Sequence, residues 1–571
     1  MKFPRNDFLK KIINFIILAY LFFFLSLFIT DYSFIHGVGF TNISGFTALL
    51  LALLFIRWML DKKSFGQIYI FKKFVQLTKI NDRSLLVVFF LLITFTISAL
   101  SIVRHLSFSS MAWDMGAFDQ AFWNTLQGNI FFSSLRGNIS LLGDHFEPIL
   151  FLIVPFYALW RHVFTLLIIQ ALLLGSSVFP LYLIAKHKLK SQVLIFAFIT
   201  SFALSKAIRG IGLSDFHPEA FIVPLCFLAF YALTSKKNLL FILSIFFILA
   251  CKETSVFVVI GFGIYAFFAL KRKLTGLLLI ILAIFFWFLE TKLIIPSLND
   301  SHTGYYFYNR MPFGSTYQEN LVFVLKNPLK FISFIFIPEK ISFCIKLFGL
   351  AGFCSFFAPA QYILFIVPLF ILLLGTPQLS GYYSLSSHYV AFVLPFVYIS
   401  SIYGAANLIE FIKRRQVSKR ISPDKIKIIL SAYIIIISLF FYGKTDAYKF
   451  RRFIDGIRQG RSFEKIAYLS RIPKDASVSA SANLVPHLSG RKYIFEWNPE
   501  TDLSLKTDYI VIDTTLVDYM PLSVRSKIPE FFNKATKAGY KKVFQGPSKT
   551  FFIFFNPDND NSSVVNYRWN N

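Results

Sequence analysis

Carboxylate and histidine side chains in this chain gather in a few short polar segments between long apolar runs. The first segment extends from Met111 to Glu147 and contains W-D-M-G-A-F-D-Q-A-F-W-N, followed by G-D-H-F-E. Charged residues are only 15% of the 571 residues, so their concentration here is selective. A carboxylate beside a membrane loses hydration and is costly to keep there unless it has a function. The segment therefore indicates chemistry at a lipid–water boundary.

Asp114 and Asp119 are the candidate catalytic carboxylates of this segment. Apolar residues recur at helical spacing after Asp114, for example Met115, Phe118 and Phe122. This pattern predicts an amphipathic helix in the membrane interface, with Asp114 at its N-terminal end, where the helix dipole stabilises a carboxylate. We interpret Asp114 as a general base facing a bound substrate; the alternative is that it only caps the helix. Asp119 points toward a different face and is the second candidate.

Further polar segments carry the candidate substrate- or phosphate-binding residues. Segments 143–148 and 214–219 each combine an acid, a histidine and a glutamate where an apolar run begins, and segment 251–255 interrupts a long apolar run. Histidine can donate to a phosphate, transfer a proton or bind a metal, and lysine can hold a phosphate as a point charge. The candidates are His145, Glu147, Arg209, Asp215, His217, Glu219, Lys252, Glu253 and His388.

Each of these side chains also has a structural interpretation. The histidines can be polar caps at the membrane interface, and Lys252 can form an internal ion pair with Glu253 or Asp215. The acids and histidines of segments 143–148 and 214–219 could together hold a divalent cation, although their spacing matches no metal-binding signature. Metal dependence is therefore left open, and no other cofactor is indicated.

The composition identifies the class of protein. Hydrophobic residues make up 56% and aromatic residues 19% of the chain, which is more apolar surface than a water-soluble core can use. The net charge of +28 comes from lysines and arginines in short loops between apolar runs. That distribution is the positive-inside pattern of membrane proteins, and it argues against a nucleic-acid partner. The four cysteines show neither metal-binding nor disulfide spacing and are expected to be packing residues.

The basic loops predict the topology. Apolar runs of roughly 17–25 residues are long enough to cross a bilayer, and we predict about thirteen spans, the first two near 12–30 and 43–60. The N-terminus is expected on the cytoplasmic side of the membrane and the C-terminus on the opposite side. The candidate residues all fall on the external face, although the topology was assigned from lysines and arginines of the opposite face. This convergence predicts one shared pocket.

Three regions are expected. Residues 1–84 form a two-span anchor region with a basic cytoplasmic loop, 85–443 form the membrane core, and 444–571 form a small extracytoplasmic α/β domain. In the last region, short β-like runs alternate with helix-like stretches, and no nucleotide-binding fingerprint is present. The β-like runs are 477–481, 493–497 and 509–514, and the helix-like stretches are 461–471 and 527–538.

Four motifs together resemble a domain-of-unknown-function family of prokaryotic multi-pass proteins that are predicted to be related to the GT-C glycosyltransferases. They are W-D-M-G-A-F-D-Q-A-F-W-N, G-D-H-F-E-P, S-D-F-H-P-E-A-F, and S-V-S-A-S followed by P-H-L-S-G-R. The resemblance extends from about residue 85 to 555. It implies a GT-C-like fold, a polyprenyl-phosphate-linked sugar donor and an acidic base in the first large external loop, a position that Asp114 occupies. Related enzymes carry a Lys-Pro-Pro- or His-Pro-Pro-like element later in that loop, for which His145 is the nearest match.

We therefore predict a polytopic α-helical membrane protein that transfers a sugar from a polyprenyl-phosphate carrier to an extracytoplasmic acceptor. Asp114 would deprotonate the acceptor hydroxyl, and Lys252, Arg209 or His145 would neutralise the leaving phosphate. One alternative is a transporter or flippase, in which charges line a path at several depths. Another is a non-catalytic assembly protein that uses the C-terminal domain for binding.

Overall fold

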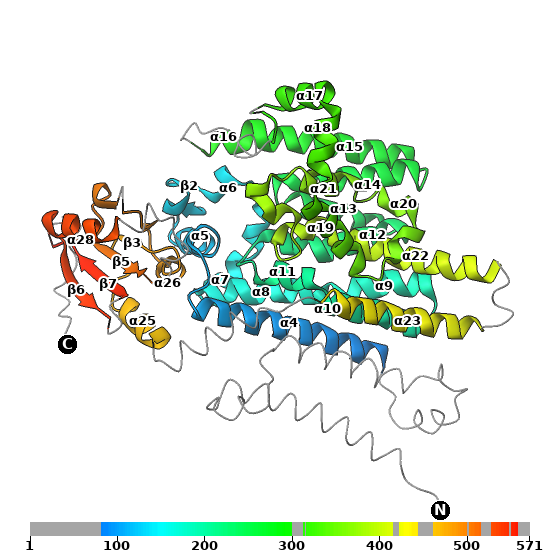
Figure 1. The fold of residues 1–571 in the computed structure, drawn as a ribbon, viewed down its shortest axis with the longest axis horizontal. Coiled ribbons are helices and arrows are strands. Elements are labelled where there is room, and N and C mark those ends of the chain that lie inside the picture. Colours follow the sequence, from blue (N-terminus) through cyan, green and yellow to red (C-terminus); the bar gives the residue numbers. More distant parts are fainter. Residues whose placement is uncertain are drawn as a thin grey trace, which may run out of the picture.

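The computed structural model describes residues 81–299, 312–314, 316–414, 422–442, 461–499, 502–514, 527–546 and 550–557. In this part of the chain, a group of apolar helices lies beside a smaller sheet-containing region formed by the C-terminal residues (Figure 1). The predicted spans near 12–30 and 43–60 lie outside the described residues. The structure confirms a mostly helical chain with several apolar helices.

Four helical stretches of the described chain are long and apolar enough to cross a membrane, and one bent pair of helices gives up to a fifth. The four are Asp82–Leu106, Val163–Leu189, Lys273–Ser297 and Leu394–Arg414, and the bent pair is Gln192–Leu204 with Lys206–Leu213. Three shorter apolar helices add to them. The total of thirteen spans stays a prediction.

The core helices have the following bounds: α4 Asp82–Leu106, α8 Val163–Ser176, α9 Val178–Leu189, α10 Gln192–Leu204, α11 Lys206–Leu213, α12 Ile222–Thr234, α13 Asn238–Leu249, α14 Val256–Phe268, α15 Lys273–Phe288, α16 Ile295–Ser297, α17 Tyr317–Lys326, α18 Pro328–Ile335, α19 Pro338–Gly349, α20 Pro359–Tyr362, α21 Ile366–Leu373, α22 Leu394–Arg414 and α23 Pro423–Phe440. Apart from α16, α17 and α18, these helices contribute apolar side chains to one large buried cluster. The long apolar run 239–270 is two helices, α13 and α14, and Lys252 lies in the break between them, as its cost inside a continuous helix predicts.

The polar segment between α4 and α8 is built from short elements. The π-helical turn η3 (Ala112–Gly116) continues into α5 (Ala117–Thr125), and a two-stranded hairpin of β1 (Phe132–Ser133) and β2 (Ile139–Ser140) leads to α6 (Leu141–Asp144) and α7 (Val154–Leu159). The expectation that α5 is an amphipathic helix with an exposed polar face is wrong. Seven of its nine residues are buried, including the polar Asp119, Gln120 and Asn124, because the C-terminal region packs on it.

The C-terminal region contains a five-stranded mixed sheet with the order β4-β3-β5-β7-β6. Strands β4, β3 and β5 are parallel, and β7 runs antiparallel to β5 and β6. Its elements are α25 Arg461–Leu469, β3 Val478–Ala480, α26 Val485–Leu488, β4 Ile494–Glu496, β5 Tyr509–Asp513, α28 Ile528–Lys537, β6 Lys541–Gln545 and β7 Phe551–Phe555. The three β-like runs and two helix-like stretches expected from the sequence are confirmed, whereas β6 and β7 were not predicted. The domain boundary at residue 444 stays a prediction.

The sheet buries two different apolar faces. Along β7, Phe552 and Phe554 face α28, while Phe551 and Ile553 face α26 and α5. This alternation follows from the two-residue period of a β-strand. The second face shares one hydrophobic cluster with the segment between α4 and α8, so the two are packed together rather than tethered.

Candidate active site

Asp114 faces a histidine from the second polar segment. Asp114 lies inside η3, whose N-cap is Met111. Asp114 therefore does not act as the helix cap. The Asp114 side chain is 43% exposed, and its Oδ1 is 3.7 Å from Nε2 of the buried His217. That separation suits an ion pair and is longer than a hydrogen bond. Gly116 lets the segment approach α26, because a Cβ there would lie 2.7 Å from Cγ1 of Val485.

The electrostatics of this pair favour the charged forms of both partners. Burial raises the pKa of Asp114, but the charge of His217 outweighs it and holds the pKa well below its usual value. Burial lowers the pKa of His217, and the Asp114 carboxylate more than reverses that effect. Asp114 is therefore ionised at neutral pH, with a cationic partner behind it.

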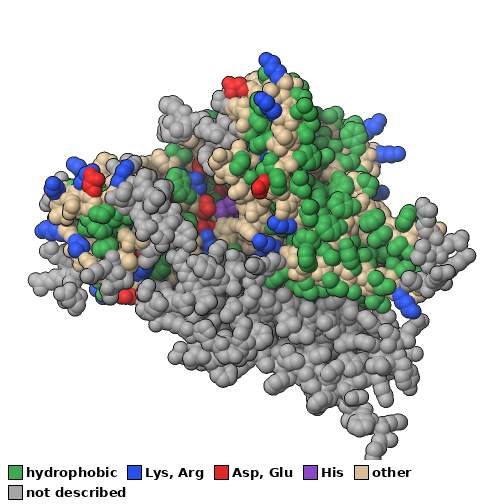
Figure 2. All heavy atoms as spheres, in the orientation of Figure 1, with side chains coloured by type: hydrophobic (Ala, Val, Ile, Leu, Met, Phe, Trp, Pro, Cys, Tyr) green, Lys and Arg blue, Asp and Glu red, His purple; other side chains and the backbone are tan. Residues whose placement is uncertain are grey.

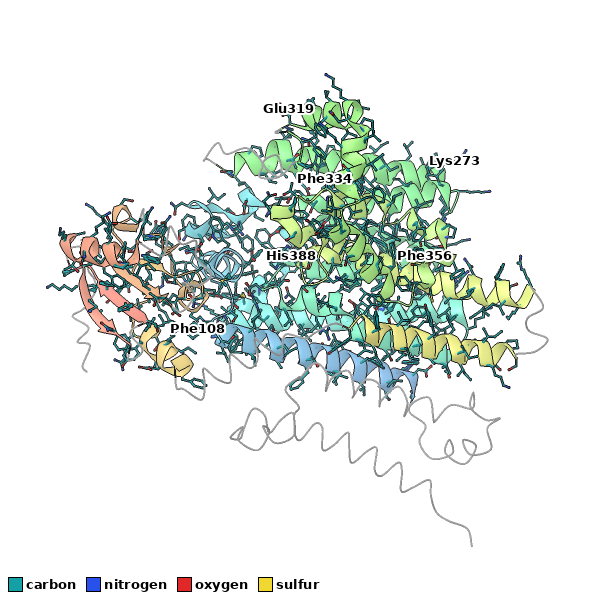
Figure 3. All side chains as sticks on the ribbon, viewed as in Figure 1. Phe108, Lys273, Glu319, Phe334, Phe356 and His388 are labelled. Atoms are coloured by element: carbon teal, nitrogen blue, oxygen red, sulfur yellow. The ribbon has the colours of Figure 1, made fainter. Side chains whose placement is uncertain are left out.

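His217 in turn stacks on His388. Their ring centroids are 3.6 Å apart with an interplanar angle of 14°, and Nε2 of His388 lies 3.8 Å from Oε1 of Glu219. His388 begins the short helix η12 (His388–Phe392), which precedes α22, and Figure 3 shows it near the centre of the molecule. Burial and then the charge of His217 lower the pKa of His388, so the two stacked rings hold a single positive charge.

Lys252 joins this network through two buried glutamates. Its Nζ is 2.9 Å from Oε1 of Glu219 and 3.6 Å from Oε1 of Glu147, and all three side chains are almost fully buried. The structural interpretation of Lys252 as an ion-paired residue is thus the one observed, although its partners are these two glutamates instead of Glu253 or Asp215. Glu253 pairs with His145 instead, and Nδ1 of His145 lies 2.8 Å from Oε1 of Glu253.

Two arginines complete the polar site. Arg104, at the end of α4, forms an ion pair with Asp215, which also accepts from the backbone N–H of Met111 at 3.2 Å. Arg136 pairs with Asp144 at 3.1 Å and donates to the carbonyl oxygen of Trp113, next to Asp114. Neither arginine was among the predicted site residues. The sequence did carry a signal for both: Arg104 directly follows an apolar run, and Arg136 lies within the first polar segment.

Two predicted residues contact groups other than those named above. Arg209 donates to the carbonyl oxygen of Tyr442 at 2.6 Å and lies over its ring, so its described contacts are with the end of α23. Asp119 is buried and accepts hydrogen bonds from the hydroxyls of Tyr157 (2.7 Å) and Ser489 (2.6 Å). Burial raises its pKa to about 6 despite these two bonds.

The assembled site is rich in acids and opens to one side. Figure 2 shows acidic and histidine side chains exposed in a recess between the C-terminal region and the core helices. In the described part of the chain, no three histidine, cysteine, aspartate or glutamate side chains converge as metal ligands would. Apart from Asp119, the carboxylates described above are instead paired with lysine, arginine or histidine. Among the described carboxylates of this site, Asp114 is the most exposed, and the buried ones are paired with cations.

A buried polar network where apolar helices meet a surface recess is typical of a membrane protein with a site for a polar substrate. The chain belongs to the family described as predicted membrane protein (DUF2079), which matches residues 104–541. The family membership expected from the motifs is therefore confirmed. Among solved structures, the chain is similar to that of ArnT from Cupriavidus metallidurans bound to undecaprenyl phosphate. The TM-score is 0.44 with 9% sequence identity, covering 82% of this chain and 97% of that one. None of the curated proteins compared with the chain matches it.

Proposed function

We propose that this protein is a membrane glycosyltransferase that moves a sugar from a polyprenyl-phosphate carrier to an acceptor outside the cytoplasmic membrane. The observation that carries the proposal is the half-exposed carboxylate of Asp114, supported from behind by His217 and His388. A carboxylate held ionised at the edge of a polar recess can accept a proton from a hydroxyl group. The class of donor comes from the resemblance of the loop motifs to a family predicted to be related to the GT-C glycosyltransferases.

In the proposed reaction the acceptor hydroxyl donates its proton to Asp114 while its oxygen forms a bond with the anomeric carbon of the sugar. The bond between that carbon and the phosphate oxygen breaks, and the electron pair leaves with the polyprenyl phosphate. Because its pKa is depressed, Asp114 is a weak base whose contribution includes orienting the hydroxyl. His217 stays protonated and keeps the carboxylate directed toward the recess.

Arg136 is the cation best placed to neutralise the leaving phosphate. It contacts the backbone beside Asp114, its side chain is 19% exposed, and a guanidinium can bind a phosphate through two parallel hydrogen bonds. Lys252 is less suited to this role than the sequence indicated, because two buried glutamates already surround its ammonium group. Arg209 contacts Tyr442 instead.

Transfer can be measured with the purified protein in lipid nanodiscs. The protein is incubated with a panel of radiolabelled polyprenyl-phosphate sugars and an envelope extract as acceptor, and label is followed from the lipid fraction into other material. The expected result is consumption of at least one donor with release of polyprenyl phosphate. If every donor stays intact while sealed vesicles containing the protein take up a lipid-linked or polar substrate, the protein is a transporter and the proposal is wrong.

A further inference from the structure

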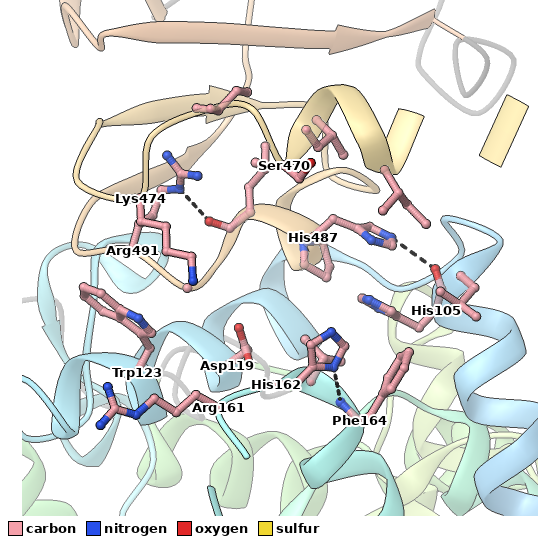
Figure 4. Close-up of a pocket in the computed structure, with 18 of the residues that line it drawn as sticks. His105, Asp119, Trp123, Arg161, His162, Phe164, Ser470, Lys474, His487 and Arg491 are labelled. Carbon is pink, nitrogen blue, oxygen red and sulfur yellow. Dashed lines mark hydrogen bonds between the residues drawn. The ribbon is translucent and has the colours of Figure 1, made fainter. Parts of the chain in front are cut away.

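A cavity of about 520 Å³ lies where the C-terminal region packs on the polar segment, away from the Asp114 site. Its walls come from the end of α4, from α5, from the turn that precedes α8 and from residues 466–491. This volume is within the range of about 300–1,000 Å³ that small-molecule sites occupy. Figure 4 shows the residues that line it.

Helix α5 separates this cavity from the Asp114 site. Phe118 directs its ring toward His217, with 6.2 Å between ring centroids, whereas Asp119 and Trp123 line the cavity. Successive positions on a helix point about 100° apart, so neighbouring residues can serve different sites. The cavity is therefore a second site that the proposed transfer reaction does not use.

The cavity is positively charged. Arg161, Lys474 and Arg491 line it, and Asp119 is the one acid among its lining residues. The Asp119 carboxyl group is already engaged by two hydroxyls, and Arg491 is buried and bound to three backbone carbonyls. Arg161 and Lys474 are exposed, and within the described ranges neither has a carboxylate oxygen within ion-pair distance. Two cations that have no carboxylate partner in the described part of the chain favour an anionic ligand at this cavity.

Three histidines supply uncharged polar groups to the same cavity. His487 donates from Nε2 to the carbonyl oxygen of His105 at 3.1 Å, and their rings stack at 4.1 Å. Burial lowers the pKa of His487 to about 3, so that ring is neutral. Nδ1 of the buried His105 has no hydrogen-bond partner in the described part of the chain. Nδ1 of His162 accepts from the Phe164 N–H at 3.1 Å, which leaves its Nε2–H as a donor.

Unsatisfied neutral donors and acceptors suit hydroxyl groups, and a buried polar atom without a partner is costly until a ligand or water satisfies it. Trp123 adds a partly exposed aromatic ring to the wall, against which the C–H face of a sugar ring can pack. In Figure 4, Arg161, Trp123, Lys474 and Arg491 lie toward one end of the cavity and the three histidines toward the other. An anionic group and a hydroxyl-bearing ring can thus be recognised together.

We propose that this cavity binds a small anionic saccharide. Its phosphate or carboxylate group contacts Arg161 and Lys474, its ring packs on Trp123, and a hydroxyl accepts from Nε2–H of His162. The proposal is independent of glycosyl transfer, because binding requires neither Asp114 nor a lipid-linked donor.

Isothermal titration of the full-length protein in nanodiscs tests this proposal with four probes: glucose 6-phosphate, glucuronate, glucose and inorganic phosphate. We expect at least one of the two anionic sugars to bind at least about tenfold more tightly than glucose and inorganic phosphate. The two anionic probes distinguish a phosphate ligand from a carboxylate ligand. Binding should weaken as salt rises, because Arg161 and Lys474 are exposed to solvent.

Three variants locate the binding. Arg161→Gln with Lys474→Gln should weaken the anionic sugar by about tenfold or more and leave the melting temperature unchanged, since both side chains are exposed. Trp123→Ala should remove the preference for the sugar over inorganic phosphate. Lys537→Gln, on α28 at the other face of the sheet, is the matched control and should change nothing. The proposal is overturned if no probe binds, if inorganic phosphate binds as tightly as both anionic sugars, or if Lys537→Gln weakens binding as much as the double variant.

Discussion

His217 and His388 stack with 3.6 Å between their ring centroids, which joins the segment after α11 to the segment before α22. Two imidazoles this close share one proton more readily than they hold two, since like charges in a buried site repel strongly. The shared proton sits on His217, between the carboxylate of Asp114 and the ring of His388. The stack thus connects the buried Glu219–Lys252 ion pair to the accessible carboxylate through a chain of contacts.

Asp114→Asn should abolish most transfer and leave the fold intact. Asparagine keeps the size of the side chain but cannot accept a proton, and loss of a general base typically costs about 10²–10⁴-fold in rate. The measurement is turnover of the polyprenyl-phosphate donor, with the melting temperature followed in parallel. A folded variant with transfer close to that of the wild type would show that Asp114 is not the base.

Lys252→Met should destabilise the protein, because it leaves Glu219 and Glu147 buried without their cation. Removing one partner of a buried ion pair typically costs about 3–5 kcal/mol. The double variant Lys252→Met with Glu219→Gln should recover part of that loss in thermal unfolding. If Lys252 instead binds the donor phosphate, Lys252→Met would keep its melting temperature and raise only the KM for the donor.

Asp119 should make stability depend on pH. Burial raises its pKa from the usual 3.8 to about 6 in the folded protein, so the folded state holds the proton more tightly. The contribution of Asp119 to the free energy of unfolding is fully present below pH 3.8. It is lost as the pH rises through about 6, and the total loss is about 3 kcal/mol. Asp119→Asn mimics the neutral acid and lacks this loss.

The melting temperature of Asp119→Asn relative to the wild type should therefore be higher at pH 7.5 than at pH 5. Transfer by this variant should fall less than transfer by Asp114→Asn, because Asp119 bonds Tyr157 and Ser489 away from the recess. A difference between variant and wild type that does not change with pH would exclude a raised pKa for Asp119.

Gly210→Ala should disturb the position of His388. A Cβ at residue 210 would lie 2.1 Å from the carbonyl oxygen of Leu385 and 2.8 Å from Cα of Ser386, so the backbone leading to His388 must move. Overpacking of this kind costs about 1–3 kcal/mol. We expect a lower melting temperature and slower transfer, whereas the control Gly381→Ala has room for its Cβ and should resemble the wild type. Equal effects of the two substitutions would argue against this contact.

The predicted topology can be checked by labelling single cysteines in intact cells with a membrane-impermeant reagent. Asn129 and Lys541 are exposed positions on the side predicted to be external, and Lys273 is an exposed position predicted to be cytoplasmic. Asn129→Cys and Lys541→Cys should be labelled, and Lys273→Cys should react only after the membrane is opened. The reverse pattern would invert the topology and remove the proposed extracytoplasmic reaction.

Which residues form the site could be predicted from the sequence, because ionisable residues are rare and costly in apolar segments. That rule selected Asp114, His217, Glu219, Lys252 and His388, all of which the structure brings into one network. Their pairing was not predictable, because the choice between neighbouring acids depends on how separate helix ends meet. Lys252 contacts Glu219 and Glu147 rather than the adjacent Glu253 for this reason.

The errors have a common physical source in packing. Helix α5 has the spacing of a surface helix, yet the C-terminal region covers its polar side, so Asp119 became a buried hydrogen-bond acceptor. Arg209 is close to the Asp215 segment in sequence, but it contacts Tyr442. Strand β7, F-F-I-F-F, has no alternation of polar and apolar residues because both of its faces are buried. For this reason the period-two pattern of a half-exposed strand did not identify it.

The hydrophobic cluster shared by α5 and the sheet has a consequence for biogenesis. Ser489 follows Asp119, its hydrogen-bond partner, by 370 residues. At a synthesis rate of about 5–20 residues per second, α5 is complete roughly 20–70 s before that partner leaves the ribosome. During that interval Asp119 and Gln120 of α5 lack their hydrogen-bond partners from residues 489–492. Insertion of the last helices and folding of the polar segment are therefore coupled in time, and a nascent chain stalled before residue 480 should remain bound to chaperones or be degraded.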